Sequence, residues 1–354
     1  MNVSIQYGIS GRTASAVAAS VEAAVLGGRL APGTLLPPVR TLAASLHLSA
    51  ATVAAAYRTL GIRGLVVGDG RRGTRVALRP PLVARRPPPV PAGMRDLAEG
   101  NPDPRWLADL RPALRRLGAR PGLYGEADPL PALRRLAARQ LEQDGIPAEN
   151  LAVVGGAMDG VERVLQAHLR PGDRVAVEDP GYAGVLDLIG ALGLLPVPMA
   201  LDDLGPRPEA LEAALRFGVQ AVIVTPRAQN PTGAAIDEGR ARALRALLDR
   251  HPDVLVIEDD HAGPVAGAPA LTLAHARKPR WAVVRSVSKS LGPDLRLAVL
   301  AGDATTIGRV EGRQSLGAGW VSHVLQATVA ALWSEAATDR RLREAAQAYA
   351  RSRR

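Results

Sequence analysis

The chain has 354 residues, of which 47% are hydrophobic and 22% charged, and a formal net charge of +10 at pH 7. This length allows two or three domains, and this composition is that of a folded protein rather than a disordered one. No apolar run reaches the roughly 18 residues of a membrane span, the N-terminus lacks a signal-peptide pattern, and cysteine is absent, so we expect a cytoplasmic protein without membrane partner, disulfides or thiolate chemistry.

The positive charge is concentrated in the N-terminal part. Residues 1–90 hold eleven arginines but only two acidic residues, Glu22 and Asp69, and carry a net charge of +9. The remaining residues hold 33 basic and 32 acidic side chains and are nearly neutral. A basic segment joined to a neutral one predicts that the N-terminal part binds a polyanion such as nucleic acid.

Three helices are predicted in the basic part. Val17, Val21 and Val25 have helical spacing within residues 13–28, and "VRTLAASLHL" (39–48) is a second, shorter helix. A third helix begins after Ser49, a natural N-cap, in "SAATVAAAYRTLGIRGL" (49–65). A short helix, a tight turn and a capped helix form a helix-turn-helix pattern, for which a plain three-helix bundle is the alternative.

A two-stranded ribbon is predicted to follow these helices. The segment "LVVGDGRRGTRVAL" (65–78) reads as a wing that turns at Asp69-Gly70. Arg71, Arg72 and Arg75 on this ribbon are suited to contact DNA phosphates.

Residues 28–60, followed by "GLVVGDGRRGTRV" (64–76), resemble the winged-helix domain of the GntR regulators. The resemblance implies a DNA-binding domain over residues 1–78 and a double-stranded DNA operator as partner. Ala50 and Ala54 stand where the family often has arginine, so base contacts are expected to be few. The residues expected to contact DNA are Arg40, Ser49, Thr52 and Arg58, together with the three arginines of the wing. Residues 79–94 are rich in proline and arginine, which predicts a semi-rigid linker.

From residue 95 onward, short apolar runs alternate with helical patterns. This alternation predicts an α/β fold with a mostly parallel sheet, in which ligands bind beyond the carboxyl ends of the strands. Polar or glycine-rich stretches follow successive runs: "GGAMDG" (155–160), "DPGY" (179–182), "TPRAQNPTG" (225–233), "DDH" (259–261) and "VSK" (287–289). The sequence therefore predicts one ligand site at this edge of the sheet.

Lysine is rare in this chain, since only Lys278 and Lys289 are lysines among 44 basic residues. Arginine cannot replace lysine where a deprotonatable amine must form a Schiff base. Lys278, in the polar run "HARKPR", is expected to be a surface lysine retained by chance, and this is also the alternative for Lys289. The position of Lys289 at the predicted site favours a chemical role.

The other residues at this edge are suited to pyridoxal phosphate. A helix N-terminus at "GGA" and the guanidinium of Arg296 favour a phosphate, to which Ser286 and Ser288 add hydroxyl groups. Asp259 supplies a carboxylate for a pyridinium nitrogen, and Tyr182 an aromatic face. Single features have simpler interpretations: "NPTG" is a good turn and Tyr182 a core residue. A metal site at "EDDH" is disfavoured because adjacent strand residues alternate faces.

Residues 96–335 resemble the fold-type-I aminotransferases, with "EGNPDPRW", "LYGEADPLPALR", "GGAM", "EDPGY", "NPTG", "EDDH" and "SVSKSLGPDLRL" in the expected order. The resemblance implies the large domain of this fold over residues 95–335, with a mostly parallel seven-stranded sheet, in a homodimer. It implies that pyridoxal 5'-phosphate forms an aldimine with Lys289. The other cofactor contacts implied are Asp259 to the ring nitrogen, Asn230 and His261 to the ring hydroxyl, Tyr182 stacked on the ring, Gly156, Ala157, Ser286, Ser288 and Arg296 to the phosphate, and Tyr124 to the phosphate of the neighbouring subunit. His261 stands where the family usually has tyrosine.

The aminotransferase resemblance also implies a C-terminal small domain that binds a substrate carboxylate through an arginine. After residue 335 the sequence has one helical segment, 336–354, so we expect this small domain to be absent and Leu342, Ala346 and Tyr349 to have little to cover them. Two alternatives would account for this: the chain is truncated, or it has lost amino-acid substrate binding while keeping the cofactor pocket. A winged helix joined to such a body resembles the MocR group of GntR-type regulators.

The leading hypothesis is a transcriptional regulator that senses pyridoxal phosphate or its adduct with an amino acid or amine. The competing hypothesis is a working aminotransferase with an accessory DNA-binding head, which loss of substrate orientation would make inefficient. A third alternative is a degenerate chain that folds poorly.

Overall fold

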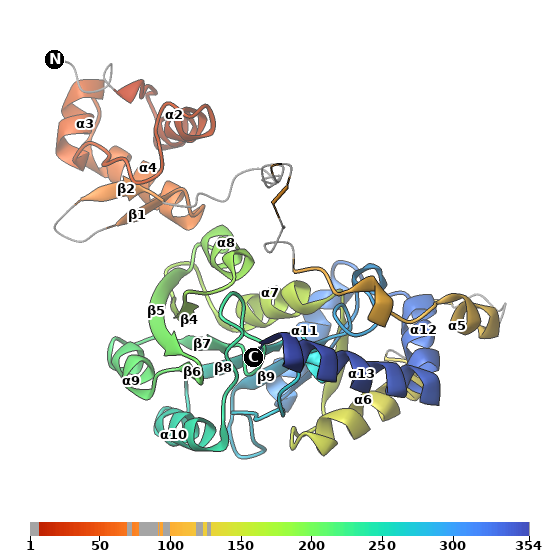
Figure 1. The fold of residues 1–354 in the computed structure, drawn as a ribbon. Coiled ribbons are helices and arrows are strands. Elements are labelled where there is room, and N and C mark those ends of the chain that lie inside the picture. Colours follow the sequence, from red (N-terminus) through yellow and green to blue (C-terminus); the bar gives the residue numbers. More distant parts are fainter. Residues whose placement is uncertain are drawn as a thin grey trace. The chain divides into compact units, whose positions relative to one another are not determined.

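The computed structural model describes residues 7–68, 73–77, 91, 93–94, 100–117, 123–125 and 129–353. The winged-helix part and the larger part that begins at residue 100 each have their own hydrophobic core. Figure 1 shows the ribbon of both parts. Most of the predicted linker, and Arg71 and Arg72 at the tip of the predicted wing, lie outside the described residues. Within the described ranges no single helix is long and apolar enough to cross a membrane, and helices α3 and α4 meet that criterion only when counted together across their bend.

The N-terminal part has the predicted helix-turn-helix with a two-stranded ribbon. Its elements are α2 (Ala14–Leu26), α3 (Val39–Leu46), α4 (Ala50–Ile62), β1 (Val66–Gly68) and β2 (Thr74–Val76). Val17, Val21 and Val25 are buried in its core, as their spacing predicts. Ser49 begins α4 by accepting a hydrogen bond from the Thr52 amide at 3.1 Å, and the axes of α3 and α4 bend by 118°. The two strands pair antiparallel.

The larger part contains an eight-stranded sheet in the order β3-β10-β9-β8-β7-β4-β5-β6. Strands β4, β7, β8 and β9 are parallel, whereas β10 runs antiparallel to both of its neighbours. The strand bounds are β3 (Leu151–Val154), β4 (Arg174–Asp179), β5 (Leu195–Asp202), β6 (Gly205–Pro206), β7 (Ala221–Val224), β8 (Leu255–Asp260), β9 (Trp281–Ser286) and β10 (Ala298–Gly302). The mostly parallel sheet is confirmed; the strand beyond the seven expected is β6, a two-residue edge strand that pairs antiparallel with β5.

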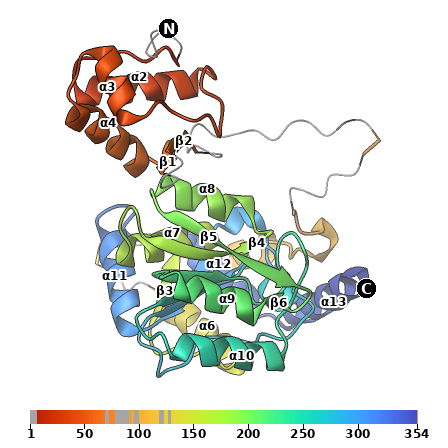
Figure 2. The same cartoon turned by 90° about the vertical axis from the view of Figure 1, so that its left-hand side faces the viewer.

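Helices pack on the two faces of this sheet (Figures 1 and 2). Helices α6, α9, α10 and α12 share a core with Val256 and Val283 of the strands. Helix α7 packs on the opposite face, so close that a Cβ added to Gly160 would lie 2.8 Å from Val284 and 3.1 Å from Val154. The helices and 3-10 turns are η2 (Pro104–Trp106), α5 (Arg111–Arg116), α6 (Pro131–Gln143), α7 (Ala157–His168), α8 (Ala183–Ala191), α9 (Pro208–Arg216), α10 (Glu238–Asp249), η3 (Gly263–Val265), η4 (Pro293–Leu295), α11 (Ala304–Ser315), α12 (His323–Trp333) and α13 (Ala336–Arg353).

Helix α13 is better covered than the sequence predicts. Leu342 packs against the main core, and Ala345 on the same helix is fully buried. The hydroxyl of Tyr349 accepts a hydrogen bond from the Asp103 amide at 2.9 Å. The expectation that this helix lacks covering contacts is therefore wrong, because the segment around η2 and the turn η3 pack against it.

Candidate functional site

The register of β10 brings two predicted phosphate-binding residues together. Because β10 is antiparallel, its first residues lie at the carboxyl edge of the parallel strands, where Ala298 pairs with both Ser286 of β9 and Val154 of β3. Arg296 precedes Ala298 by two residues, and Gly156 follows Val154 by two. Accordingly, a Cβ added to Gly156 would lie 3.4 Å from Arg296 Nη2.

This corner of the sheet is suited to an anion. Gly156 directly precedes α7, whose first residue is Ala157. The φ of Gly156 is 111°, a backbone conformation that favours glycine. The helix N-terminus presents backbone N–H groups and the positive end of the helix dipole, and Arg296 adds a guanidinium. Asp159 in the first turn pairs with Arg163 at 2.9 Å, so its negative charge is neutralised.

Ser286 and Ser288 lie in one short turn after β9. The Ser286 hydroxyl donates to Ser288 Oγ at 3.0 Å, and the Ser288 amide donates to Ser286 Oγ at 3.1 Å. Ser286 is buried, whereas Ser288 is half-buried. The two hydroxyl groups are thus held beside each other in the three residues that directly precede Lys289.

Asp259 is a buried carboxylate at the end of β8. Its Oδ1 has no hydrogen-bond partner among the described residues. Burial raises the pKa of Asp259, and the charges of His261 and Lys289 oppose that rise. Because a buried acceptor without a donor costs free energy, this oxygen is suited to receive a hydrogen bond from a ligand.

Lys289 is half-buried, and its Nζ donates a hydrogen bond to the Gly100 carbonyl at 2.6 Å. Burial lowers the pKa of Lys289, while Asp259 opposes the change. A lowered pKa increases the fraction of neutral amine, which is the form that attacks an aldehyde.

Three predicted cofactor residues keep much of their surface exposed. Asn230 is exposed, Tyr182 keeps 47% of its surface exposed, and Tyr124 keeps 92%. Tyr124 packs edge-to-face on Trp320, with ring centroids 5.5 Å apart.

The loop that carries Asn230 is held in place by a buried hydrogen-bonded pair, Gln229 and Glu178. Gln229 donates to the Glu178 carboxylate at 3.0 Å and accepts from the Thr232 amide at 3.1 Å. The other oxygen of Glu178 accepts from the Thr225 amide at 2.8 Å. Burial raises the pKa of Glu178 to about 7. The "NPTG" sequence is therefore a turn, as its composition predicts, and it is fixed to the end of β4.

A buried ion network around Asp260, the residue after Asp259, was not predicted from the sequence. Asp260 accepts from Arg227 Nε and Nη2, both at 2.8 Å, and from Arg285 Nε at 2.7 Å. Arg285 also pairs with Asp144 at 2.7 Å. Burial alone would raise the pKa of Asp260, but the two guanidinium groups outweigh it and lower the pKa to about 2.

Strand alternation separates the carboxylates of "EDDH", as predicted. Asp260 points to the ion network, and Glu258 accepts hydrogen bonds from Thr272 and Ala274 at 2.9 Å. Asp259 lies between them in sequence and does not share these partners. Within the described ranges no group of His, Asp or Glu side chains could hold a metal ion.

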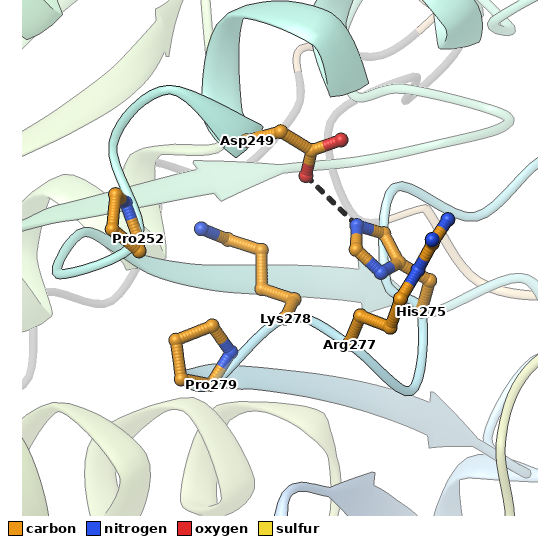
Figure 3. A pocket seen from close by; sticks show the side chains of 6 residues that line it. All are labelled: Asp249, Pro252, His275, Arg277, Lys278 and Pro279. Carbon is orange, nitrogen blue, oxygen red and sulfur yellow. Dashed lines mark hydrogen bonds and ion pairs between the residues drawn. The ribbon is translucent and has the colours of Figure 1, made fainter.

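Lys278 is not a surface lysine, which corrects the prediction from its polar surroundings. It is 3% exposed, and its Nζ donates to the carbonyls of Leu248 and His251, both at 3.2 Å, at the end of α10. Beside it lies a cavity of about 330 Å³, where His275 bonds to Asp249 at 2.8 Å (Figure 3). Lys278 caps a helix C-terminus, where a cation is favoured.

The predicted DNA contacts of α3 and α4 differ in their surroundings. Arg40 and Arg58 are exposed. The hydroxyls of Ser49 and Thr52 are 2.8 Å apart and belong to the cap of α4. In the ribbon, Arg75 donates to the Gly33 carbonyl at 3.3 Å, which links β2 to the turn before α3.

Two family descriptions match the chain. "Bacterial regulatory proteins, gntR family" matches residues 13–76, and "Aminotransferase class I and II" matches residues 93–354. The chain is 42% identical over 342 residues to the vitamin B6 salvage pathway transcriptional repressor PtsJ of Salmonella typhimurium. The aligned region covers 97% of this chain and 80% of that protein. The chain is also 30% identical over 341 residues to the HTH-type transcriptional regulator TauR of Rhodobacter capsulatus, and this aligned region covers 82% of this chain and 67% of that protein.

Solved aminotransferases resemble the larger part of the chain. The kynurenine aminotransferase of Pyrococcus horikoshii, solved with PMP, is 25% identical with a TM-score of 0.64, covering 71% of this chain and 66% of that one. The aspartate aminotransferase of Rhizobium meliloti is 26% identical with a TM-score of 0.63 over the same shares. The chain thus spans about two thirds of the length of these enzymes. Pyridoxal phosphate is the cofactor of this family. The chain belongs to the MocR-type regulators, in which a GntR-type DNA-binding domain is joined to a domain of the class I and II aminotransferase family.

Proposed function

We propose that this chain is a DNA-binding transcriptional regulator whose aminotransferase-like domain binds pyridoxal 5'-phosphate as cofactor or effector. The observation that carries the proposal is the buried Asp259 Oδ1, which lacks a donor among the described residues. A protonated pyridine nitrogen would supply that donor. The name of the Salmonella relative, which refers to vitamin B6 salvage, supports the same cofactor.

The described residues fit this cofactor, which supplies an aldehyde and an electron-withdrawing ring when bound. The Lys289 amine is the group available to the aldehyde, and Asp259 would hold the ring nitrogen. Arg296 and the start of α7 would hold the phosphate. The remaining proposed contacts are Ser286 and Ser288 to the phosphate, Asn230 and His261 to the ring hydroxyl, and Tyr182 to the ring face.

The visible absorption spectrum of the protein titrated with pyridoxal phosphate tests this proposal. Because the chain has two lysines, Lys289→Ala and Lys278→Arg form a matched pair. A visible band is expected in the wild type and in Lys278→Arg but not in Lys289→Ala. Reduction with borohydride followed by peptide mapping of the wild type locates the modified lysine even if the Lys278 variant folds poorly.

The same titration separates the proposal from its competitors. No band in folded wild-type protein, or a label on Lys278, would refute the cofactor site. Asp259→Asn keeps the shape of the side chain but removes its charge, and it should weaken cofactor binding about tenfold or more, since hydrogen bonds to charged groups are strong. Turnover of an amino acid with an oxoacid would instead support an aminotransferase.

The regulator is proposed to act as a homodimer. Tyr124 packs on Trp320, and two apolar residues four positions on either side of Trp320 in sequence are exposed, Leu316 at 90% and Val324 at 58%. Burying such side chains against a second copy would be favourable, and two winged helices could then read two half-sites. Sedimentation of the wild type should give a dimer, and Val324→Asp should give a monomer.

Operator binding is tested by selection from a random pool of DNA duplexes. Enrichment of a sequence with two half-sites is expected for the wild type, with affinity that falls steeply as salt rises. Arg40→Ala should weaken this binding, whereas Arg277→Ala, an exposed arginine of the other domain, should not. Failure to enrich any sequence would count against a sequence-specific regulator.

A further inference from the structure

The Lys289 amine, which is proposed to react with the cofactor, makes a hydrogen bond within the chain. Lys289 Nζ donates to the Gly100 carbonyl at 2.6 Å, across 189 residues of sequence. Gly100 has a φ of +59°, and a Cβ at this position would lie 3.8 Å from the same Nζ. A charged donor at this distance makes a strong hydrogen bond, so it fixes the start of the segment that contains Gly100.

The rest of that segment is held by α13. The Asp103 amide donates to the Tyr349 hydroxyl at 2.9 Å, and Arg341 Nη1 donates to the Leu107 carbonyl at 2.6 Å. Helix α13 is itself docked closely: a Cβ added to Gly267 after η3 would lie 3.1 Å from the Ala346 carbonyl oxygen. Residues 100–107, here named the strap, therefore have one anchor in the candidate site and two on a packed helix.

The two kinds of anchor respond differently to a ligand. Neither anchor on α13 involves a group that an aldehyde would modify. The anchor at Gly100 depends on the ammonium group of Lys289. When an ammonium condenses with an aldehyde, a C=N bond forms, the carbonyl oxygen leaves as water with two of the three N–H protons, and one N–H remains. Because the ring hydroxyl of pyridoxal phosphate is ortho to its aldehyde, the remaining N–H would be directed to that hydroxyl oxygen and would no longer reach the Gly100 carbonyl.

We infer that the strap reports whether Lys289 is free or occupied: the free amine holds Gly100, and a bound aldehyde releases it while Tyr349 and Arg341 keep the far end in place. This inference rests on the proposed cofactor site. Five residues (95–99) separate the strap from the predicted linker (79–94), so the released end is the end of the strap that is nearer in sequence to the DNA-binding domain. Occupancy of the site would thereby change the constraint on the linker.

Hydrogen–deuterium exchange of the peptide 100–107 tests the strap, with the visible spectrum recorded on the same samples. In the wild type, pyridoxal phosphate should accelerate exchange at the Gly100 and Asn101 amides, next to the released carbonyl, roughly tenfold or more, the scale of losing a charge-assisted hydrogen bond, whereas the Asp103 amide, still bonded to Tyr349, should not change. Peptides of α13 should not change. Lys289→Met, which lacks a donor, should exchange rapidly with or without the cofactor. Lys289→Arg keeps a donor but cannot condense, so it should exchange slowly under both conditions.

The outcomes distinguish the strap from the cofactor proposal. A visible band without a change in exchange at 100–107 would overturn the strap and leave the cofactor site standing. Absence of the band would refute the cofactor site, and Lys289→Met would then still decide whether the amine holds Gly100. Wild-type exchange rates in that variant would overturn the inference.

Discussion

Replacing Asp260 by asparagine should destabilise the protein strongly. The side chain is 2% exposed and accepts three hydrogen bonds, of 2.7–2.8 Å, from two arginines that are each 5% exposed. Asparagine keeps the shape but leaves two buried guanidinium groups with only the partly exposed Asp144 as counter-ion. Removing one partner of a buried ion pair costs about 3–5 kcal/mol, a large share of the roughly 5–15 kcal/mol that stabilises a folded protein.

Asp109→Asn is the matched control for this prediction. Asp109 also accepts from Nε and Nη2 of one arginine, Arg111, at 3.0 and 2.8 Å, but both side chains are exposed. The unfolding midpoint in urea, followed by tryptophan fluorescence, should fall markedly for Asp260→Asn and stay unchanged within error for Asp109→Asn. Equal effects of the two substitutions would refute the argument from burial.

Three further predictions concern buried groups outside the proposed cofactor contacts. Burial raises the pKa of Glu258 from 4.5 to about 7, so folding favours the protonated form of this side chain. The stability that protonated Glu258 contributes should therefore be lost as the pH rises through about 7. Urea titrations at about pH 5 and pH 8 should show this loss in the wild type and a smaller difference between the two pH values in Glu258→Gln. Lys278→Met removes the donor to two carbonyls at the end of α10 and should cost about 1–3 kcal/mol in thermal unfolding, whereas Arg277→Met, at an exposed position, should be neutral. Gly160→Ala should cost about 1–3 kcal/mol because its Cβ would lie 2.8 Å from a valine of β9, whereas Gly308→Ala, with no atom within 4 Å, should be neutral or stabilising; similar midpoints for the two would contradict the close packing of α7.

Features encoded by neighbouring residues could be predicted from the sequence. The spacing of Val17, Val21 and Val25 places three valines on one side of a helix, and all three are buried. Ser49 caps the helix that it was predicted to begin. The alternation of Glu258, Asp259 and Asp260 between faces follows from strand geometry alone. These features depend on periodicity and capping, which act over a few residues.

Contacts between distant residues were decided by the tertiary structure. The sequence placed Arg296 and Gly156 at one edge, but the antiparallel register of β10 brings them together. The polar run around Lys278 suggested an exposed side chain, yet packing against the end of α10 buries it. The bond between Lys289 and Gly100 has no signal in either local segment. Composition and short-range patterns determine which helices and strands form and which residues are chemically able to act. Which of those residues contact each other depends on how strands and helices far apart in sequence pack, because side chains are buried and paired only where the complete fold excludes water.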